Sequence, residues 1–458
     1  MPQPQPPRFF YGWIIVAIAT FALLISNGLS IGGLPVFYKP IQEDLLQIGS
    51  VTAQTKDAVT GLGAGLTFLL AGVFSFVIGL FIRRIGLRWL MAAGCVVLGG
   101  GLLFYSAAET PLDVYISHSA LGLSLGLVGV MIQTVLISNW FRRKRGTAMG
   151  ILLAGTSFGG VLVPLIATPL IAKYGWRPAM QILSLSVWLV LLPAIIFLVR
   201  DRASDVGLDF DGGESGGNAS VNERANLTSE SGISPNPEHR TPQSEIRPPD
   251  GATFVEALRS PMFWIISLCA ILIFYPIFTI SQQFNLYLQN TIGVSRETAG
   301  VAQSILFATS VGGKFLFGWL CDKFQTRVVI MSCCGLMFLS TLMLLGFLTP
   351  STIYVFLVPF GLGYGGTFVL VQLLTVESFG LRDIGKILGA LTLIETLGGF
   401  LGSVVTGYLA SLNNGDYTTA FYGVTAAAGL AFLSTFGIYF FGISHRRVAD
   451  TPGHNPER

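Results

Sequence analysis

The sequence predicts an all-α integral membrane protein with twelve transmembrane helices in two similar halves of six. Of its 458 residues, 52% are hydrophobic and only 11% are charged, which lies far outside the balance of a soluble domain. Apolar stretches of more than about 18 residues recur along the chain, and a helix of that length crosses the hydrocarbon core of a bilayer. The stretches are continuous rather than short and alternating, which argues against a membrane β-barrel.

Twelve stretches qualify as membrane-spanning helices. The first carries no charged residue from Tyr11 to Tyr38. Basic clusters separate several others: 83–88 follows the second stretch, 142–145 the fourth, 323–327 the eighth and 382–386 the tenth. The predicted spans are 11–37, 57–82, 88–108, 112–139, 147–172, 178–199, 262–289, 297–320, 328–348, 352–379, 385–411 and 418–442.

The distribution of Lys and Arg predicts which side of the membrane each loop faces. Short loops rich in these residues stay in the cytoplasm. With both termini cytoplasmic, the opposite side carries only Lys56, Lys173, Arg177 and Arg296. The first helix lacks a signal-peptide cleavage site and is long enough to remain in the bilayer. We therefore expect an integral protein of the plasma (inner) membrane with both termini in the cytoplasm.

Composition also limits partners and cofactors. The net charge of +3 is too small to indicate a nucleic-acid partner. The five cysteines lack the spacing of metal ligands, so neither a metal nor another cofactor is expected. The short aqueous segments contain no nucleophile–base pair and no phosphate loop, which argues against an enzyme. The expected partners are the lipid bilayer and small molecules, and the chain is expected to act as a monomer.

One hydrophilic segment divides the chain. Residues 201–260 are mostly rich in Gly, Ser, Pro, Asn and charge, which predicts a flexible cytoplasmic linker. The linker separates an N-terminal half, residues 1–200, from a C-terminal half, residues 261–442. Residues 443–458 are predicted to form a cytoplasmic tail.

The two halves repeat each other. An offset of 239 residues lays Gly79 on Gly318 and Arg88 on Arg327, and the same offset aligns glycines of the fifth and eleventh helices without a gap. A duplicated six-helix unit is expected of a secondary transporter, whose substrate site lies near the middle of the membrane between halves that rock.

The stretches GLFIRRIGLR (79–88) and GWLCDKFQTR (318–327) resemble the Gly-x-x-x-Asp-Arg/Lys-x-Gly-x-Arg loop of the major facilitator superfamily. The resemblance implies the major facilitator fold and a charged latch that closes the cytoplasmic side. Ordinary positive loop charge is the alternative. The first copy has Arg83 where the family has Asp, which leaves Asp322 as the predicted switch. The predicted gating residues are Gly79, Arg84, Arg88, Gly318, Asp322, Lys323 and Arg327.

Further stretches narrow the resemblance to the monocarboxylate transporter and oxalate:formate antiporter branch. They are FFYGW at 9–13, PVFYKPI at 35–41, NWFRRKRGTAMGILLAGTSFGG at 139–160, YGWRPAM at 174–180 and FGLGYGG at 360–366. The resemblance implies rocker-switch transport of small organic carboxylates, and we expect proton-coupled transport of lactate- or pyruvate-like monocarboxylates. Anion exchange of the oxalate:formate type and a transporter-like nutrient sensor are the alternatives.

Lys39, Lys314 and Glu395 are ionisable residues in or beside the predicted spans, where charge is costly and marks functional positions. Lys39 is predicted at the outer end of the first helix, which Pro40 ends. Its long side chain can simply reach the lipid headgroups. The resemblance instead matches it to the family's first-helix lysine, which meets the incoming carboxylate.

Lys314 is predicted about two helical turns, roughly 12 Å, before Asp322 at the cytoplasmic end of the eighth helix. The resemblance places it where the family carries an arginine that pairs with the substrate carboxylate, although lysine lacks arginine's bidentate fork. A helix–helix ion pair is the alternative. Ser310, one turn earlier, replaces the aspartate of proton-coupled relatives.

Glu395 is predicted near the middle of the eleventh helix, where oxalate exchangers of the branch carry a lysine. One lysine with one glutamate leaves little net charge, which favours a monoanion or a neutral substrate. Burial favours the neutral form of a carboxyl, so Glu395 is the predicted proton-coupling residue. A permanent Lys314–Glu395 pair is the alternative. Tyr364 and Asn285 complete the predicted substrate site, with packing and interhelical hydrogen bonding as their alternatives.

Overall fold

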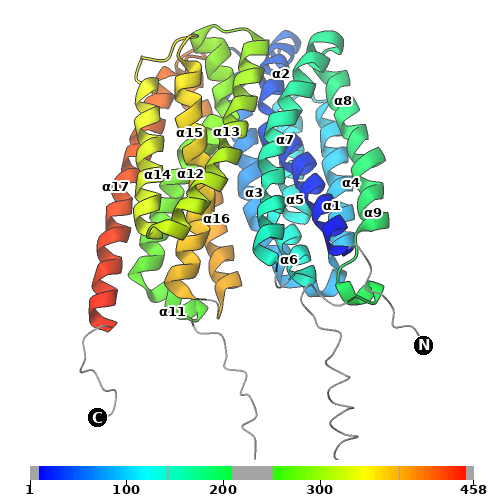
Figure 1. The fold of residues 1–458 in the computed structure, drawn as a ribbon. Coiled ribbons are helices and arrows are strands. Elements are labelled where there is room, and N and C mark those ends of the chain that lie inside the picture. Colours follow the sequence, from blue (N-terminus) through cyan, green and yellow to red (C-terminus); the bar gives the residue numbers. More distant parts are fainter. Residues whose placement is uncertain (1–9, 142–143, 209–250, 381, 450–458) are drawn as a thin grey trace, which may run out of the picture.

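A computed structural model describes residues 10–141, 144–208, 251–380 and 382–449. The described chain is a bundle of long helices that run between two ends (Figure 1). α1 begins and α17 ends at the same end, which we call the terminal side, and the opposite end is the distal side. An isolated strand-like bridge pairs Gly251 with Gly380.

Several spans of the N-terminal half are interrupted. Gly129 separates α5 from α6 within the fourth span, and the π-helical turn η2 separates α8 from α9 within the sixth. The helices of this half are α1 Gly12–Asn27, η1 Gly28–Gly32, α2 Pro35–Ile48, α3 Lys56–Ile85, α4 Leu87–Tyr105, α5 Pro111–Val128, α6 Val130–Trp140, α7 Arg145–Tyr174, α8 Trp176–Ser186, η2 Val187–Leu191, α9 Leu192–Leu198 and η3 Ala203–Val206.

The C-terminal half begins with the short helix α11 on the terminal side (Figure 1). Thr253 caps this helix, because its hydroxyl accepts a hydrogen bond from the Glu256 N–H. The helices of this half are α11 Phe254–Arg259, α12 Pro261–Tyr287, η4 Leu288–Ile292, α13 Arg296–Lys323, α14 Thr326–Thr341, η5 Leu342–Leu344, α15 Ile353–Phe379, α16 Ile384–Leu412 and α17 Thr418–Ala449.

The structure confirms twelve spans that are long and apolar enough to cross a membrane within the described residues. Large apolar side chains point outward from them: Leu189, Phe197 and Phe440 are 65–72% exposed. Exposed apolar surface of this extent requires an apolar environment. The bundle therefore has the surface of an integral membrane protein.

The first span ends earlier than the sequence predicts. The helix continues only to Gly32, and the separate helix α2 begins at Pro35. Proline fits the first helical turn, where no backbone N–H is needed. Pro40 does not end a helix at Lys39, contrary to the prediction, because the break falls earlier and α2 continues through Pro40 to Ile48.

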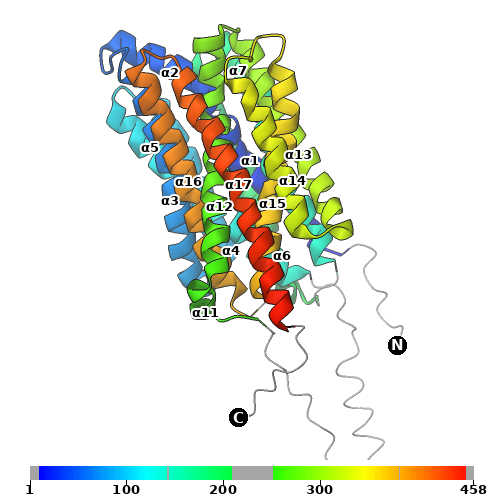
Figure 2. The same ribbon diagram turned by 90° about the vertical axis from the view of Figure 1, so that its left-hand side faces the viewer.

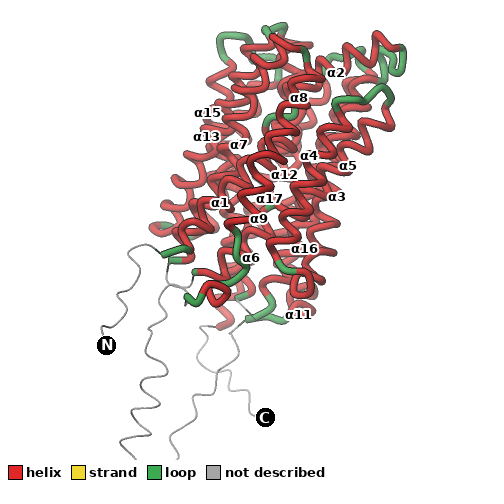
Figure 3. The backbone as a smooth tube through the Cα atoms, turned by 90° about the vertical axis from the view of Figure 1, so that its right-hand side faces the viewer, coloured by secondary structure: helices red, strands yellow, loops and turns green. Residues whose placement is uncertain are grey.

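The predicted repeat is present in the fold. α3 and α13, α4 and α14, and α7 and α16 each start within one residue of the 239-residue offset. The two halves stand side by side in Figure 1, where their helices diverge toward the terminal side, and Figure 2 shows the bundle with the C-terminal half in front. Two cross-half helix pairs form the seams, α7 with α13 and α3 with α16. Figure 3 shows the seams on opposite faces of the bundle.

The two ends of the predicted linker that the structure describes, near Asp201 and Phe254, form hydrogen bonds with the N-terminal and C-terminal halves, respectively. Asp201 accepts hydrogen bonds of 2.9 Å from two backbone N–H groups at the start of α4. Asp383 accepts one of 3.0 Å from the Phe254 N–H, and this hydrogen bond lowers the pKa of Asp383. Residues 209–250 of the predicted linker and 450–458 of the predicted tail lie outside the described residues.

Candidate transport site

The α7–α13 seam is an antiparallel helix pair with small residues at its contacts. Ser304 Oγ donates to a carbonyl of α7 at 3.0 Å, and Ser310 Oγ donates to Ser157 Oγ at 3.0 Å. Between them, Gly160 lies against the Phe307 ring, so close that a Cβ on Gly160 would overlap it. The small residues of α7 therefore let the two halves approach closely.

The α3–α16 seam repeats this design. The Ala58 N–H donates to Ser411 Oγ at 2.8 Å near the distal end. Further along, a Cβ on Gly61 would lie 2.8 Å from the Gly407 Cα. Gly72, deeper in the bundle, lies against Thr396. Both seams thus extend from the distal side toward the middle of the bundle.

Buried polar contacts join the distal ends of the two halves. Tyr38 Oη donates to Gln282 Oε1 at 2.6 Å. Tyr417 Oη donates to Asp57 Oδ1 at 2.8 Å, and Gln42 Nε2 donates to the same oxygen at 3.1 Å. None of these five side chains is more than 2% exposed. The structure is therefore closed on the distal side.

Lys39 lies on α2, outside the membrane-length spans and among charges of both halves. Burial lowers the pKa of Lys39, against the opposing effect of Glu43 and with smaller contributions from Arg296 and Lys56. Glu43 forms an ion pair with Arg296 of the other half, with Nη2 and Oε2 3.3 Å apart. Lys39 therefore stands beside a cross-half ion pair on the distal surface.

The side chain of Lys314 crosses the α7–α13 seam. Its Nζ donates to Thr156 Oγ1 and Ser157 Oγ at 2.8 Å each and to the Leu153 carbonyl at 3.3 Å. It also lies 5.6 Å from the centroid of the Phe368 ring. Among the described residues, no carboxylate oxygen lies within 4.0 Å of this Nζ. The ammonium is thus held between the halves by neutral oxygens.

A stripe on α15 connects the surroundings of Lys314 and Glu395. Tyr364, Phe368 and Gln372 are spaced four residues apart and therefore share one helix face. Gln372 Nε2 donates to Glu395 Oε1 at 3.4 Å, and Glu395 is only 5% exposed. Phe368 and Gln372 are about 6 Å apart along the axis of α15. Lys314 and Glu395, which contact these two residues, therefore lie about one helical turn apart in depth. They form no ion pair in this conformation.

Tyr364 and Asn285 are both buried. The Tyr364 ring packs edge-on against Phe307, with centroids 5.9 Å apart. Asn285 Oδ1 accepts a hydrogen bond from Gln289 Nε2 at 2.6 Å, whereas its Nδ2 has no partner among the described residues. An unpaired buried donor is costly, so this amide can bind a polar ligand. Contact of either residue with substrate stays a prediction.

Comparison with known proteins identifies the family. Residues 16–403 match the sequence profile of the Major Facilitator Superfamily, and a second match covers residues 266–457. The chain belongs to the major facilitator superfamily. It is 24% identical to the MFS transporter asaE of Aspergillus flavus, over 96% of this chain and 90% of that protein. It is 30% identical to monocarboxylate transporter 14 of Mus musculus, over 38% of this chain and 32% of that protein.

A solved structure has the same fold. A bacterial homolog to the human lysosomal transporter Spinster, in an inward-facing and unoccupied conformation, superposes with a TM-score of 0.66 at 17% identity, covering 94% of this chain and 98% of that one. The predicted fold class is therefore confirmed. The protein is a major facilitator transporter of small molecules and not an enzyme.

The residues that resemble the superfamily's cytoplasmic loop lie on the terminal side. The Arg88 guanidinium lies 5.3 Å from the Trp89 ring centroid, and Lys323 Nζ lies 4.0 Å from that of Trp319. Neither contact crosses to the other half. The surroundings of Gly79 and the side chains of Arg84 and Asp322 are not among those that the structure describes. The gating role of Gly79, Arg84, Arg88, Gly318, Asp322, Lys323 and Arg327 stays a prediction.

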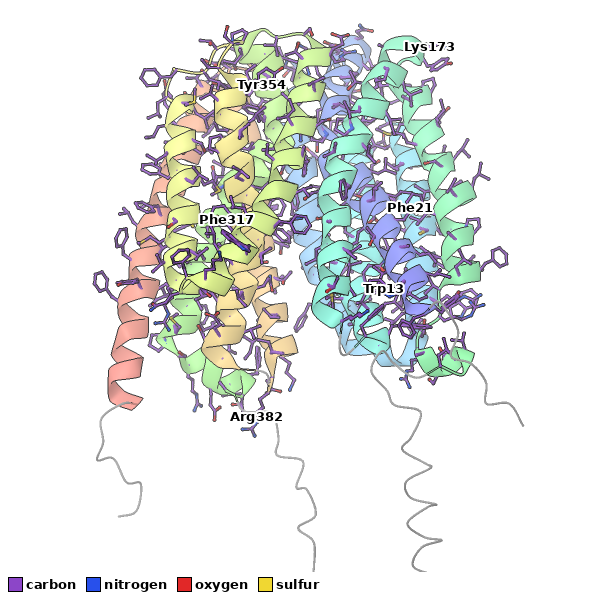
Figure 4. The ribbon with its side chains drawn as sticks, in the orientation of Figure 1. Trp13, Phe21, Lys173, Phe317, Tyr354 and Arg382 are labelled. Carbon is purple, nitrogen blue, oxygen red and sulfur yellow. The ribbon has the colours of Figure 1, made fainter. Side chains whose placement is uncertain are left out.

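A groove lies on the α7–α13 seam of this transporter, nearer the distal side than Lys314. Its volume is about 470 Å³, and its lining is mainly apolar, with Pro164 and Val301 on its two sides. Lys173, which Figure 4 places near the distal end, and Glu297 also line it. None of the predicted substrate residues does, so the groove is separate from the Lys314 site.

Sequence reasoning missed three residues that contact Lys314 or Glu395: Thr156, Ser157 and Gln372. Small hydroxyl side chains are common in membrane helices, so their type alone is not informative. A usable signal was nevertheless present, because the 239-residue offset that aligns the halves lays Thr156 on Glu395. Two of the missed residues hold Lys314, and the third contacts Glu395.

Proposed function

We propose that this transporter carries a small organic monocarboxylate, of the size of lactate or pyruvate, together with a proton. The observation that carries the proposal is the Lys314 ammonium, which stands at a seam between the halves with neutral acceptors only. A charged group within membrane spans is costly and marks substrate pathways. A bound carboxylate supplies the counter-ion that this ammonium lacks among the described residues within 4.0 Å.

The charge balance favours a substrate with one carboxylate. A dicarboxylate such as oxalate needs two cations, whereas the ionisable residue at the level next to Lys314 is the acid Glu395. The 30% identity to monocarboxylate transporter 14 over part of the chain supports the same substrate class. Tyr364 is the proposed polar contact for the rest of the substrate, whereas Asn285 lies near the distal end of α12, too far from Lys314 to contact a molecule of this size bound there.

Glu395 is the proposed proton-coupling residue. It is almost fully buried, and its hydrogen-bond partner among the described residues is the neutral amide of Gln372. Burial disfavours the charged carboxylate. The amide can donate through its nitrogen to a carboxylate or accept through its oxygen from a protonated carboxyl. The pocket around Glu395 therefore accommodates both protonation states.

The proposed direction follows from the basic loops. Because Lys and Arg concentrate on the terminal side, we place that side in the cytoplasm and the distal side outside, in a plasma or inner membrane. Lys39 is then the first cation that an incoming anion meets. The gating residues on the terminal side close the cytoplasmic mouth when the distal side opens. The transporter is proposed to work as a monomer.

The test is uptake of radiolabelled lactate and pyruvate into proteoliposomes with an acidic exterior. Lys314→Ala should reduce uptake to the level of protein-free vesicles, because the carboxylate loses its counter-ion. Glu395→Gln should abolish the dependence on the pH gradient, because the amide cannot bind and release a proton. Lys173→Ala and Glu109→Gln change the same residue types outside the site and should leave uptake within about twofold of the unmodified protein.

Two results would contradict the proposal. If neither acid is transported, or if Lys314→Ala transports as well as the unmodified protein, the monocarboxylate assignment fails. If the acids bind to the purified protein but do not cross the membrane, the chain is a sensor of the kind considered from the sequence.

A further inference from the structure

The Lys314 ammonium is fully hydrogen-bonded without a counter-ion. An ammonium has three N–H donors, and all three find acceptors on α7 of the opposite half: the Leu153 carbonyl, Thr156 Oγ1 and Ser157 Oγ. We call these three acceptors the cradle. A further hydrogen bond holds the Ser157 hydroxyl of the cradle, because Ser310 Oγ donates to Ser157 Oγ at 3.0 Å. Without substrate, the protein itself therefore provides a hydrogen-bond acceptor for each N–H of the Lys314 ammonium.

The cradle lies at the boundary between packed and separated helix segments. Along α13, contacts with α7 occur at Gly300, Ser304, Phe307 and Ser310 before Lys314 makes the last described one. Beyond it, Gly318 has no atom within 4 Å of a Cβ built there, and the side chains of Phe315 and Trp319 are 62% and 52% exposed. When rigid halves rock, one set of helix segments packs together to close the distal side and another set to close the terminal side. The two sets meet at the level of Lys314.

A contact at such a boundary moves least when the halves rock around a central site. The distal contacts must break when the outside opens, and the terminal side must then close. Lys314, at the level between them, can keep its hydrogen bonds to α7 in both conformations. The cradle is thus placed to hold the ammonium throughout the conformational change of the empty protein.

The internal repeat shows why the cradle is neutral. The 239-residue offset lays Thr156 on Glu395, so the C-terminal half has a carboxylate where the N-terminal half has a hydroxyl. A glutamate at position 156 would face Lys314 directly and form a permanent ion pair. The threonine instead provides an acceptor that a substrate carboxylate can outcompete, because a charged acceptor binds an ammonium more strongly than a neutral one.

We propose that the Leu153 carbonyl and the Thr156 and Ser157 hydroxyls replace the substrate carboxylate in the empty protein, and that this lets the empty protein change conformation. The transporter then performs net transport rather than obligatory exchange. The inference rests on the proposed function, in which Lys314 binds the substrate carboxylate. An unsatisfied ammonium within the spans is costly, so a protein without the cradle should reorient only when substrate is bound.

The experiment compares two rates in the same proteoliposomes. Net uptake of labelled lactate into empty vesicles requires the return of the empty protein, whereas exchange against internal unlabelled lactate does not. In the double variant Thr156→Val with Ser157→Ala, we expect net uptake to fall at least tenfold and exchange to stay within twofold of the unmodified protein. The conservative double variant Thr156→Ser with Ser157→Thr keeps both hydroxyls and should restore net uptake.

Ser304→Ala is the matched control. It removes a cross-seam hydrogen bond of the same kind, one that does not touch Lys314, and it should leave the ratio of the two rates unchanged. Size-exclusion chromatography of each purified variant verifies that it is folded. If both rates fall together in the cradle variant, the hydroxyls bind the substrate itself, and if neither falls, the cradle is dispensable. Either result overturns the inference.

The unmodified protein separates this inference from the proposed function. If it exchanges lactate but shows no net uptake, the cradle does not permit empty return, while monocarboxylate transport stands. If it shows neither rate, the proposed function itself fails.

Discussion

Replacing Tyr417 by phenylalanine should open the distal side. The change removes one hydroxyl that donates to Asp57 Oδ1 at 2.8 Å across the two halves. Both residues are fully buried, so water cannot replace the lost donor in the closed conformation. Asp57 keeps the hydrogen bond from Gln42 at 3.1 Å, but Gln42 belongs to the same half and does not join the halves.

The size of the effect follows from the type of hydrogen bond. One that involves a charged group contributes about 1.5–3 kcal/mol, which corresponds to a shift of roughly 10- to 150-fold in the equilibrium between distal-closed and distal-open conformations. The charged contact between Glu43 and Arg296, the other one that joins the halves among the described residues, contributes much less, about 0–1 kcal/mol, because both side chains are partly exposed. Asp57–Tyr417 should therefore dominate the electrostatic part of distal closure.

Spin labels at Gln47→Cys and Ser351→Cys report this equilibrium, since both positions are exposed on the distal side, one in each half. Cys321, the native cysteine that is not buried, is replaced by serine in every sample. We expect one short distance population in this background and an added longer population after Tyr417→Phe. Tyr287→Phe is the matched change. Tyr287, like Tyr417, packs its ring on Phe421, but its hydroxyl makes no cross-half hydrogen bond among the described residues. This control should keep the short population alone, and an unchanged distribution in Tyr417→Phe would refute the reasoning.

Two further substitutions test the α7–α13 seam. Gly160→Ala makes a Cβ overlap the Phe307 ring. Overpacking of this kind costs about 1–3 kcal/mol, so the distal-open population should rise in the same spin-label experiment. Gly150→Ala, with no atom within 4 Å of the new Cβ, should leave this population unchanged. Thr156→Glu brings a carboxylate to Lys314 Nζ in place of the hydroxyl now 2.8 Å away; the apparent KM for lactate should rise at least tenfold, and an unchanged KM would show that Lys314 does not bind the substrate carboxylate.

The span pattern could be predicted because it depends on composition alone. A run of apolar residues is a property of consecutive positions, and the offset between Gly79 and Gly318 is visible without coordinates. The break after the first span was missed. Pro40 is a stronger helix-ending signal in sequence than Gly32, yet the chain breaks at the glycines and places Pro40 inside α2. Proline can be accommodated within a helix when neighbouring groups satisfy the freed carbonyl.

The site was predicted only in part, because it depends on which helices meet. Lys314 stands out as a charge in an apolar stretch, but Ser157 is 157 positions away along the chain and becomes its partner only through the α7–α13 contact. Sequence alone also left open a permanent pair between Lys314 and Glu395. The structure places them about one turn of α15 apart. The Lys314 ammonium lies over the Phe368 ring, and the Glu395 carboxyl accepts a hydrogen bond from Gln372.

This separation bears on how substrate and proton are coupled in the proposed mechanism. In the empty protein, the ammonium of Lys314 and the carboxylate of Glu395 sum to zero charge. A bound monocarboxylate adds one negative charge, and a proton on Glu395 removes it, so the fully loaded protein is again neutral. The form that carries the anion without the proton has an uncompensated charge within the spans, which is costly. The two forms that change conformation most readily are therefore the empty one and the one loaded with one monocarboxylate and one proton, which makes the coupling electroneutral without any direct contact between Lys314 and Glu395.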